Sequence, residues 1–338
     1  MSIKNNTGLD EALAIALEGR ADESKKILMS LEQSDSRVLF NLGWHEMREG
    51  RLSSGYQYMD CGRLMNAFGG AKDPYAPLYV DQDLKGKTLL FMNEGGLGDE
   101  IINIRFAKNF HQLGAKIILG CSRNLFSLFG RIPHISAMID REVCVHSYHD
   151  YWVPAMSSPR HLNLEYKDLS GEPYLNYFNK RWVPKNNAKF KVGIRWAGNP
   201  KFEHEQHRKF PLEKMFDLTK IEGATFYSLQ RDNDMVEDIP CIDMRYEMKT
   251  WVDTAEIIQS MDLIITSCTS IAHLSAAMGK PTWIIVPILP YYIWALPKDT
   301  SPWYNSVKLY RQTQYKNWDS PFEKIKKDLE NTIAKNQE

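Results

Sequence analysis

The sequence has no excess of either charge, because its 338 residues include 42 Lys plus Arg and 42 Asp plus Glu. No overall field is therefore expected to attract nucleic acid or an anionic membrane, although a local basic patch is compatible with this balance. The chain also lacks an apolar run of the roughly 18 residues that a membrane-spanning helix needs. Its first residues are polar, so no secretory signal peptide is expected.

Cysteine is scarce as well. The five cysteines are Cys61, Cys121, Cys144, Cys241 and Cys268. An odd number without Cys-x-x-C spacing favours reduced thiols over a disulfide framework, and it offers neither a zinc cage nor a redox motif. We therefore expect a cytoplasmic protein. With 43% hydrophobic and 25% charged residues, the chain has the composition of a globular protein with two domains and a smaller element.

Residues 262–286 have the clearest local pattern. Residues 262–267 form a short apolar run rich in β-branched side chains, which predicts a buried strand. An Ala-rich helix is expected next, and it should stop at Gly279, because glycine accepts the left-handed conformation after a last turn and Pro281 cannot continue a helix. Residues 282–286 predict a second strand, so the stretch is expected to be a βαβ unit.

The start of this predicted helix has the chemistry of an anion site. A helix that opens at the carboxyl end of a parallel strand presents free N–H groups and the positive end of its dipole. Hydroxyl groups at Ser267, Thr269 and Ser270 add donors at the same point. Helix capping explains these hydroxyls equally well, since Ser and Thr are common N-cap residues.

A second strand, turn and helix pattern is predicted at residues 87–92 and 101–113. The turn between them holds three glycines, Gly95, Gly96 and Gly98. Such residues let the backbone pass close to a ligand. Asp99 and Glu100 are expected in the first helical turn, where carboxylates suit the dipole. A diphosphate would meet two carboxylates here, so the turn favours a general base and an acceptor; capping by Asp99 is the alternative.

The remaining patterns divide the chain into a helical part and two α/β parts. Helices are expected at residues 9–18, 22–31, 36–48 and 53–66, where small and aromatic residues alternate as in degenerate tetratricopeptide repeats. Alternating strands and helices on both sides of a polar connector at residues 179–188 predict an α/β fold, with a doubly wound order in the part after the connector. The expected divisions are a helical cap at 1–72, domains at 73–178 and 179–319, and a final helix at 320–338.

Several polar residues have the spacing of metal ligands. His204 and His207 lie in a long polar loop at residues 197–209, but the sequence offers no third ligand. Two Asp-x-Asp triplets, at residues 81–83 and 232–234, are interpreted as chance occurrences. We therefore expect no metal.

Two further features border the predicted anion site. Residues 287–303 are dense in Pro, Tyr and Trp, which suits either stacking on a ligand or core packing. Gln230 follows a predicted strand at residues 225–229, and its amide both donates and accepts. It therefore suits the edge of a nucleotide base without selecting one.

Nine short segments, taken in order, resemble the glycosyltransferases of the heptosyltransferase-like family (glycosyltransferase family 9 type). The resemblance is greatest to versions with tetratricopeptide repeats, which are distantly related to the O-linked N-acetylglucosamine transferases. The segments are residues 84–90, 94–100, 192–200, 208–212, 228–230, 253–255, 269–274, 279–281 and 301–304. Three positions depart from the family: Cys268 stands where an acidic residue is usual, and Lys209 and Phe210 replace the residues that commonly follow the arginine at Arg208.

This resemblance implies a GT-B architecture, in which two Rossmann-like domains face each other across a cleft. The acceptor would lie mainly in the first domain and the nucleotide-sugar in the second. It implies Asp99 as catalytic base and Arg208 as the clamp for the departing diphosphate. The donor-binding residues implied are Asn199, Lys209, Gln230, Ser267, Thr269, Ser270 and His273, and the acceptor loop is Gly95, Gly96, Gly98 and Glu100. The implied reaction is inverting transfer from a nucleotide-sugar co-substrate, with no metal and no cofactor.

The acceptor is left open among three classes, with a saccharide hydroxyl favoured. The short helical cap is too small for a long peptide groove, which disfavours a protein hydroxyl. A hydroxymethylated base in phage DNA stays an alternative because positive charge gathers around the connector. The basic residues there are Lys180, Arg181, Lys185, Lys189 and Lys191. Two other classes of function also stay open, a non-catalytic binding module and a sugar-nucleotide epimerase.

Overall fold

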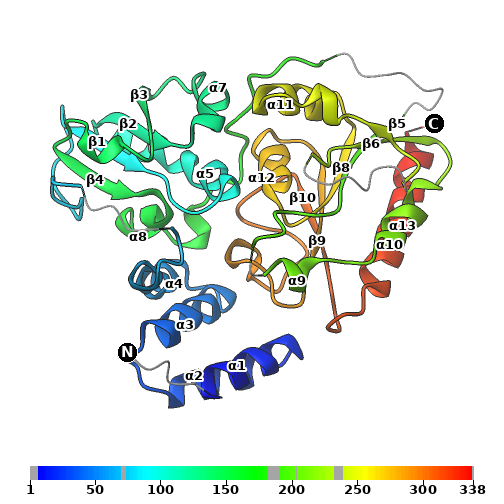
Figure 1. Ribbon diagram of the computed structural model, residues 1–338, viewed down its shortest axis with the longest axis horizontal. Helices are drawn as coiled ribbons and strands as arrows, with labels where there is room; N and C mark the ends of the chain where they lie inside the picture. The colour runs from blue at the N-terminus through cyan, green and yellow to red at the C-terminus, as the bar shows by residue number, and fades with distance from the viewer. Residues whose placement is uncertain (1–6, 70–73, 182–189, 203, 232–238, 337–338) are drawn as a thin grey trace. The chain divides into compact units, whose positions relative to one another are not determined.

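A computed structural model of the chain describes residues 7–69, 74–181, 190–202, 204–231 and 239–336 (Figure 1). The chain folds into two compact units. Unit 1 contains the residues up to Phe126, Ile132–Leu169 and Leu289–Pro297, and unit 2 contains Ser127–Arg131, Ser170–Ile288 and the residues from Lys298 onward. The units are thus built from interleaved segments, and the predicted sequence boundaries at 72, 178 and 319 stay a prediction.

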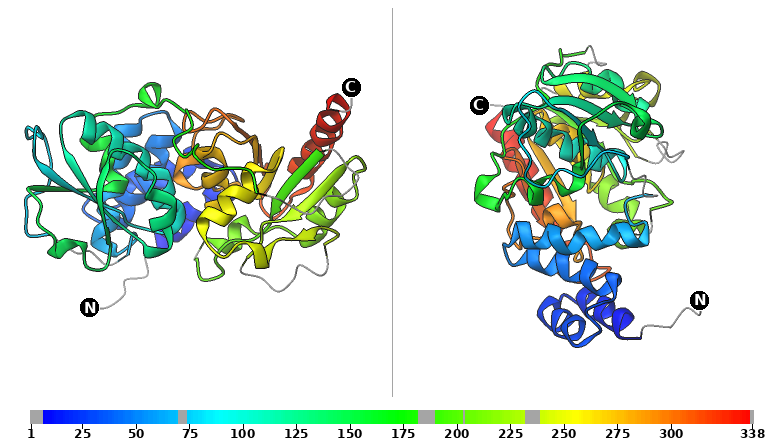
Figure 2. Two further views of the ribbon diagram at one scale, coloured as in Figure 1. Left: turned by 90° about the horizontal axis from the view of Figure 1, so that it is seen from above. Right: turned by 90° about the vertical axis from the view of Figure 1, so that its left-hand side faces the viewer.

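Unit 1 begins with helices. These are α1 (Thr7–Leu17), α2 (Ala21–Ser30), α3 (Ser36–Arg48), α4 (Leu52–Met59) and the 3-10 helix η1 (Asp60–Met65). Consecutive helices pack on each other, and α4 also packs on α8 (Ser158–His161). Figure 2 shows the N-terminal helices from two further sides. A Cβ atom at Gly43 would lie 2.7 Å from the carbonyl oxygen of Gly55, so α3 and α4 approach closely at small residues. The helices predicted at 9–18, 22–31 and 36–48 are confirmed, whereas the one predicted at 53–66 is wrong in extent, because α4 ends at Met59 and the 3-10 helix η1 follows. The tetratricopeptide interpretation stays a prediction.

The sheet of unit 1 is parallel. Its strands are β1 (Thr88–Met92), β2 (Lys116–Cys121), β3 (Ile135–Asp140) and β4 (Tyr151–Pro154), in the order β3-β2-β1-β4. The helical segments that follow β1 in this part of the chain are α5 (Leu97–Asn103), η2 (Ile104–Phe106), α6 (Ala107–Gln112), η3 (Arg123–Leu125), α7 (Phe126–Phe129, of which residues 127–129 belong to unit 2), η4 (Cys144–His146), η5 (Ala155–Ser157), α8 and η6 (Tyr166–Asp168). The single helix predicted at 101–113 is wrong in extent, because helix formation begins at Leu97 and a 3-10 turn separates α5 from α6.

The sheet of unit 2 is also parallel. Its strands are β5 (Phe190–Arg195), β6 (Ala224–Ser228), β7 (Ile242–Asp243), β8 (Leu263–Ser267), β9 (Thr282–Val286) and β10 (Val307–Arg311), in the order β10-β9-β8-β5-β6-β7. The helical segments that follow β5 in the chain are α9 (Glu205–Arg208), α10 (Leu212–Thr219), η8 (Arg245–Glu247), α11 (Trp251–Gln259), α12 (Ser270–Ala277), η9 (Tyr292–Trp294, in unit 1) and α13 (Asp319–Lys335).

Helices cover both faces of this second sheet. On one face, Val192 and Ile194 of β5 share a buried core with Met215 of α10 and Ile325 of α13. Helix α12 packs against β8 and β9 and also contacts α11 (Figure 1). The βαβ unit predicted at 262–286 is confirmed, and Gly279 ends its helix with a φ of 76°. The predicted α/β fold class is thereby confirmed.

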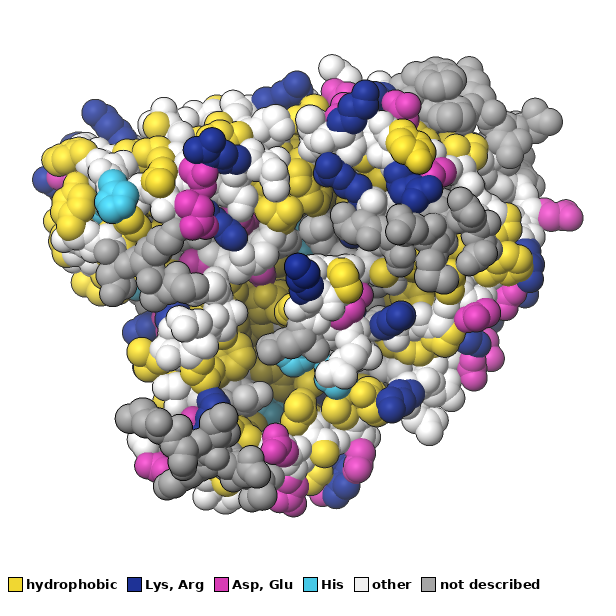
Figure 3. Space-filling view, in the orientation of Figure 1, with side chains coloured by type: hydrophobic (Ala, Val, Ile, Leu, Met, Phe, Trp, Pro, Cys, Tyr) yellow, Lys and Arg dark blue, Asp and Glu magenta, His cyan; other side chains and the backbone are white. Residues whose placement is uncertain are grey.

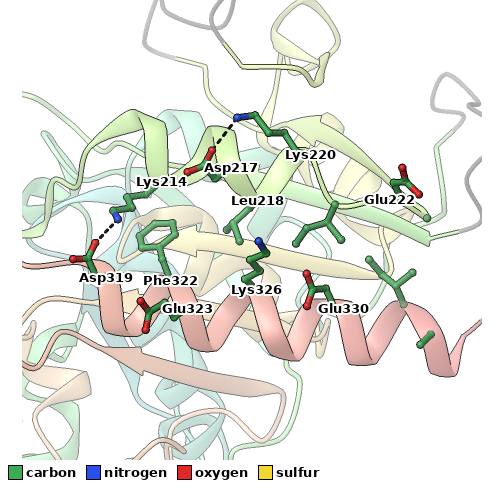
Figure 4. A pocket seen from close by; sticks show the side chains of 14 residues that line it. Lys214, Asp217, Leu218, Lys220, Glu222, Asp319, Phe322, Glu323, Lys326 and Glu330 are labelled. Carbon is green, nitrogen blue, oxygen red and sulfur yellow. Dashed lines mark hydrogen bonds and ion pairs between the residues drawn. The ribbon is translucent and has the colours of Figure 1, made fainter.

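A surface groove runs between α10 and α13, with Leu218 and Phe322 among its apolar lining residues (Figure 4). An ion pair joins Lys214 to Asp319 near one end of it. None of the predicted site residues lines this groove. Within the described part of the chain, no helix is both long and apolar enough to cross a membrane.

Candidate functional site

Both sheets place their first strand where the strand order reverses. In unit 1, β1 lies between β2 and β4, and in unit 2, β5 lies between β8 and β6. Ligands of doubly wound proteins bind outside the carboxyl ends of the strands at such a switch point. The predicted acceptor residues follow β1, and the predicted donor residues follow β5, β6 and β8. Each set therefore lies at the expected edge of its own sheet.

Asp99 is held in the first turn of α5 by two hydrogen bonds. Its Oδ2 accepts from the backbone N–H of Gly96 at 2.9 Å, and its Oδ1 accepts from the hydroxyl of Tyr291 at 2.7 Å. Burial raises the pKa of Asp99 above its usual range, although both hydrogen bonds act to lower it. Each carboxylate oxygen has a second lone pair, so Asp99 retains the capacity to accept a further hydrogen bond.

The Gly-rich turn fits closely around this carboxylate. Gly95 has a φ of 71°, and a Cβ atom there would lie 2.6 Å from Oδ2 of Asp99. The position therefore needs glycine for two reasons, its left-handed backbone and the space that the carboxylate fills. The carbonyl of Gly95 accepts from Nη1 of Arg141 at 2.8 Å, which anchors the turn from outside.

Glu100 fixes the same turn from the interior. The side chain is fully buried and accepts from the backbone N–H of Ser122 at 2.9 Å and from Nη1 of Arg141 at 3.0 Å. The Ser122 hydroxyl donates to it as well. Burial raises the pKa of Glu100, while these donors and Arg141 act to lower it. Its contacts are thus internal, and its predicted role at the acceptor stays a prediction.

The N-terminal helices also hold this turn. Arg63 of η1 donates from Nε and Nη2 to the two oxygens of Glu94, at 2.7 Å and 2.6 Å. The carbonyl of Phe68 accepts from the N–H of Gly95 at 2.8 Å. A two-pronged Arg–carboxylate pair is geometrically specific, so the helical segment fixes the position of the turn that precedes Asp99.

In unit 2, α9 brings Arg208 to the turn between β8 and α12. Its guanidinium donates to the carbonyl of Cys268 and to the carboxylate of Glu205, and it lies over the ring of Phe202 at 4.9 Å. The prediction of an irregular loop over the whole of 197–209 is wrong at this point, because α9 forms a helical turn within it.

Glu205 and Gly198 shape the place where Arg208 lies. The second oxygen of Glu205 accepts from the N–H of Gly198 at 2.9 Å, so one carboxylate joins the end of β5 to the arginine. A Cβ atom at Gly198 would lie 2.0 Å from Nη2 of Arg208. The missing side chain of this glycine therefore provides the space for the guanidinium.

The start of α12 has the composition predicted for an anion site. Thr269 is its N-cap residue, Ser270 is its first residue, and its first turn contains no acidic side chain. Ser267 is buried, and its hydroxyl has no hydrogen-bond partner among the described residues. His273 lies one turn further, with Nδ1 at 3.5 Å from the hydroxyl of Tyr304. The positive end of this helix is thus not balanced by a carboxylate of its own first turn.

The other predicted donor residues differ in exposure. Gln230 is fully buried, and its Oε1 accepts from the N–H of Ala197 at 3.2 Å. Its Nε2 has no hydrogen-bond partner among the residues the structure describes. Asn199 and Lys209 are exposed, and Oδ1 of Asn199 accepts from the N–H of Lys201 at 3.0 Å. The structure therefore brings Gln230 to the end of β5 and leaves the other two at the surface.

Sequence reasoning did not single out three residues that organise these sites. Tyr291 contacts Asp99, and Glu205 contacts Arg208. Arg195 is buried at the end of β5, where it donates to the carbonyls of Ala197 and Leu229 at 3.0 Å and 3.2 Å. The spacing of Glu205 and Arg208, three residues apart, was a usable signal. Tyr291 had no local signal beyond the aromatic density around it.

The histidines predicted as potential metal ligands make other contacts. Nδ1 of His207 lies 3.1 Å from the hydroxyl of Tyr315, and the ring of His204 is 5.8 Å from that of His207. Across the described ranges, no three His, Cys, Asp or Glu side chains form a group that could hold a metal. The triplet at 232–234 lies outside the described residues. Reaction without a metal or cofactor stays a prediction.

Comparison with known proteins identifies similar folds, but it does not assign the chain to a sequence family. No protein-family model matches the chain. Protein FlbA of Caulobacter vibrioides is 23% identical over 323 residues, and the match covers 84% of this chain and 53% of FlbA. The chain therefore spans about half the length of the curated relative that it matches.

Two solved structures are similar to the chain at 12% sequence identity and a TM-score of 0.50. A glycosyl transferase family 9 protein from Veillonella parvula DSM 2008 aligns over 73% of this chain and 90% of that chain. The E. coli ADP-heptose LPS heptosyltransferase II aligns over 75% of this chain and 100% of that chain. The chain thus has the GT-B fold of the heptosyltransferase-like proteins of glycosyltransferase family 9.

Proposed function

We propose that the chain is a glycosyltransferase that moves a sugar from a nucleotide-sugar to an acceptor hydroxyl, with inversion and without a metal. The observation that carries this proposal is the setting of Asp99. It follows the first strand of a GT-B fold, burial raises its pKa, and two donors fix its carboxylate. A positioned carboxylate with a raised pKa is suited to act as a general base.

The reaction needs little covalent chemistry from the protein. Asp99 takes the proton of the acceptor hydroxyl as the hydroxyl oxygen bonds to the anomeric carbon of the sugar. The bond from that carbon to the diphosphate oxygen breaks, and the diphosphate leaves with the electron pair. A single displacement of this kind inverts the anomeric carbon. Negative charge develops on the departing diphosphate, and stabilising it is the second requirement.

Unit 2 supports that second requirement. The free N–H groups at the start of α12 provide an anion cradle, and Arg208 lies at the turn just before it. The hydrogen bonds of Arg208 to Glu205 and to the carbonyl of Cys268 use two of the five N–H donors of its guanidinium. Glu205 neutralises part of its charge, so we propose that Arg208 acts through directed hydrogen bonds as much as through net charge.

A saccharide is the acceptor that we favour. The E. coli protein of this fold is an ADP-heptose LPS heptosyltransferase. The basic cluster that would favour DNA is weaker than its composition suggests, because Arg181 is paired with Asp253 and Glu247. Lys185 and Lys189 lie outside the described residues. Among the described residues, basic and acidic side chains are interspersed on the face seen in Figure 3.

The proposal is tested first by ligand binding and then by product analysis. A panel of nucleoside diphosphates should raise the melting temperature, since a ligand of the native state stabilises it in proportion to ln(1 + [L]/Kd). Incubation with the selected nucleotide-sugar and saccharide acceptors should release nucleoside diphosphate only when an acceptor is present. Conversion of the donor alone into an epimeric nucleotide-sugar would identify an epimerase. Donor binding without turnover for any saccharide, protein or hydroxymethylated DNA acceptor would favour a binding module.

A further inference from the structure

The segment Leu289–Pro297 belongs to unit 1 although it connects β9 and β10 of unit 2. It carries Tyr291, which donates its hydroxyl proton to Oδ1 of Asp99 at 2.7 Å. The backbone N–H of Gly96 donates to the other oxygen at 2.9 Å. Both oxygens of the carboxylate are therefore oriented, one by the turn before the helix and one by a residue 192 positions away.

The N-terminal helices hold this segment in place. Nε1 of Trp44, in α3, donates to the carbonyl of Pro290 at 2.9 Å, directly beside Tyr291. The ring of Tyr56, in α4, meets the ring of Tyr292 edge-on with centroids 6.0 Å apart. Tyr56 and Tyr292 are both buried. The residues on both sides of Tyr291 are thus attached to the helical cap, which restricts where its hydroxyl can point.

We infer that Tyr291 is a positioning residue for the base Asp99, and that the N-terminal helices serve this site by holding the segment that carries it. The inference rests on the proposed function of Asp99. It gives the helical cap a role inside the chain, because α3 and α4 determine the placement of a donor to the base. A phenol with its usual pKa near 10 is too weakly acidic to replace the carboxylate as the group that exchanges protons near neutrality.

The effect of Tyr291 on the carboxylate has a definite sign. A donor to the charged form stabilises it, so the Tyr291 hydroxyl lowers the pKa of Asp99 against the rise caused by burial. Other groups act on the same carboxylate or on its neighbours. They are Glu94 in the turn, Glu100 in α5, Tyr292 in the segment, Arg63 on Glu94, and Arg141 on Glu100. A change confined to the Tyr291 hydroxyl leaves these groups in place.

The test is Tyr291→Phe, which keeps the ring and removes only the hydroxyl. Without that donor the pKa of Asp99 rises further, so as the pH falls the carboxylate is protonated, and inactive as a base, from a higher pH onward. The acid limb of the kcat profile should move up by about one pH unit, and turnover well below that limb should fall about tenfold. Nucleotide-sugar affinity should stay within twofold. Tyr75→Phe is the control, because Tyr75 is an exposed residue of unit 1 whose hydroxyl contacts Ser147 and His149 instead.

Trp44→Phe tests the part played by the helices. It removes the indole N–H that holds Pro290, and it should move the acid limb in the same direction by a smaller amount. This variant also keeps the inference testable if Tyr291→Phe does not fold. A shift with Tyr291→Phe but none with Trp44→Phe would overturn the role of the helices.

A measurement without turnover separates this inference from the proposed function. NMR of isotope-labelled aspartate carboxyls, assigned by the signal missing in Asp99→Asn, gives the titration of Asp99 directly. A higher pKa in Tyr291→Phe than in the wild type supports the inference, and equal pKa values overturn it. If the wild type transfers no sugar to any acceptor while this pKa difference is present, the proposed function fails and the Tyr291–Asp99 coupling stands.

Discussion

Helix α5 in unit 1 and helix α12 in unit 2 both begin beyond the carboxyl end of a parallel strand, where free backbone N–H groups carry the positive end of the dipole. In α5 the first turn contains Asp99 and Glu100, so the chain supplies its own negative charge. In α12 the first turn has no acidic residue. The same backbone arrangement therefore suits a base in one unit and an external anion in the other.

Both candidate sites also contain an Arg–Glu pair that is hydrogen-bonded to a backbone carbonyl. Glu100 accepts from Arg141, which donates onward to the carbonyl of Gly95, and Glu205 accepts from Arg208, which donates onward to the carbonyl of Cys268. In each unit an Arg–Glu pair fixes a carbonyl of the loop that shapes the site. In both pairs the carboxylate is the more deeply buried partner, because Glu100 is fully buried beside Arg141 and Glu205 is 11% exposed beside Arg208, whose side chain keeps 15% of its surface exposed. Arg208 thus retains access to a ligand.

The largest expected effect comes from removing the base. Asp99→Asn keeps the size of the side chain but abolishes proton acceptance, so kcat should fall about 100-fold or more. Nucleotide-sugar affinity, measured by calorimetry, should change less than twofold because the proposed donor site lies in unit 2. Asp81→Asn is the matched control, since Asp81 is an exposed carboxylate of the same unit. Turnover that survives Asp99→Asn would remove the assignment of the base.

Removal of the positive charge of Arg208 in unit 2 should, unlike Asp99→Asn, weaken the affinity for the donor. Arg208→Ala removes the charge-assisted hydrogen bonds that we propose to the diphosphate, so donor affinity should weaken about tenfold or more, with turnover falling in parallel. Lys324→Ala, at an exposed position of α13, controls for the loss of one positive charge from the unit. Equal affinities of Arg208→Ala and the wild type in calorimetry would exclude Arg208 from the donor site.

Two glycines offer a smaller and sharper test of the same contrast. Gly95→Ala should displace the Asp99 carboxylate and lower kcat severalfold, and Gly198→Ala should displace the Arg208 guanidinium and weaken donor binding severalfold. Gly86→Ala is the control for Gly95, because Gly86 has a similar φ of 74° with no atom within 4 Å of the added Cβ.

Both Gly86→Ala and Gly95→Ala should lose stability, by roughly 1–2 kcal/mol for a left-handed non-glycine residue, in denaturant titrations. Only Gly95→Ala should slow turnover. The contrast between the units would be lost if Gly198→Ala changed kcat alone, or if Gly95→Ala changed donor affinity alone.

The local parts of this arrangement were readable in the sequence. The helix at 36–48 occurs with the predicted bounds, since its apolar periodicity and end signals lie within the segment itself. The first-turn position of Asp99 and the helix start at Thr269 follow from strand, turn and helix patterns of the same kind. Such signals locate a residue on its element.

The parts that were missed depend on contacts over long separations or on small local energies. No periodicity links Tyr291 to Asp99, 192 positions away, and aromatic density alone did not separate core packing from a contact with the base. Helix α9 is only one turn long, which is too short to give a periodic pattern of apolar residues. The 3-10 interruption after α5 likewise leaves the apolar pattern of residues 101–113 unchanged.

The smallest expected effect is that of removing divalent metal. If Arg208 and the N–H groups of α12 stabilise the departing diphosphate, the protein already supplies the positive charge that a metal would otherwise provide. Turnover in EDTA should then equal turnover with added Mg²⁺ or Mn²⁺, within the error of the assay. Asp81→Asn extends the test to the triplet at 81–83, the described Asp-x-Asp pair. Loss of turnover in EDTA with recovery on adding metal would show that unit 2 does not carry this charge by itself, and that Arg208 shares the role with an ion.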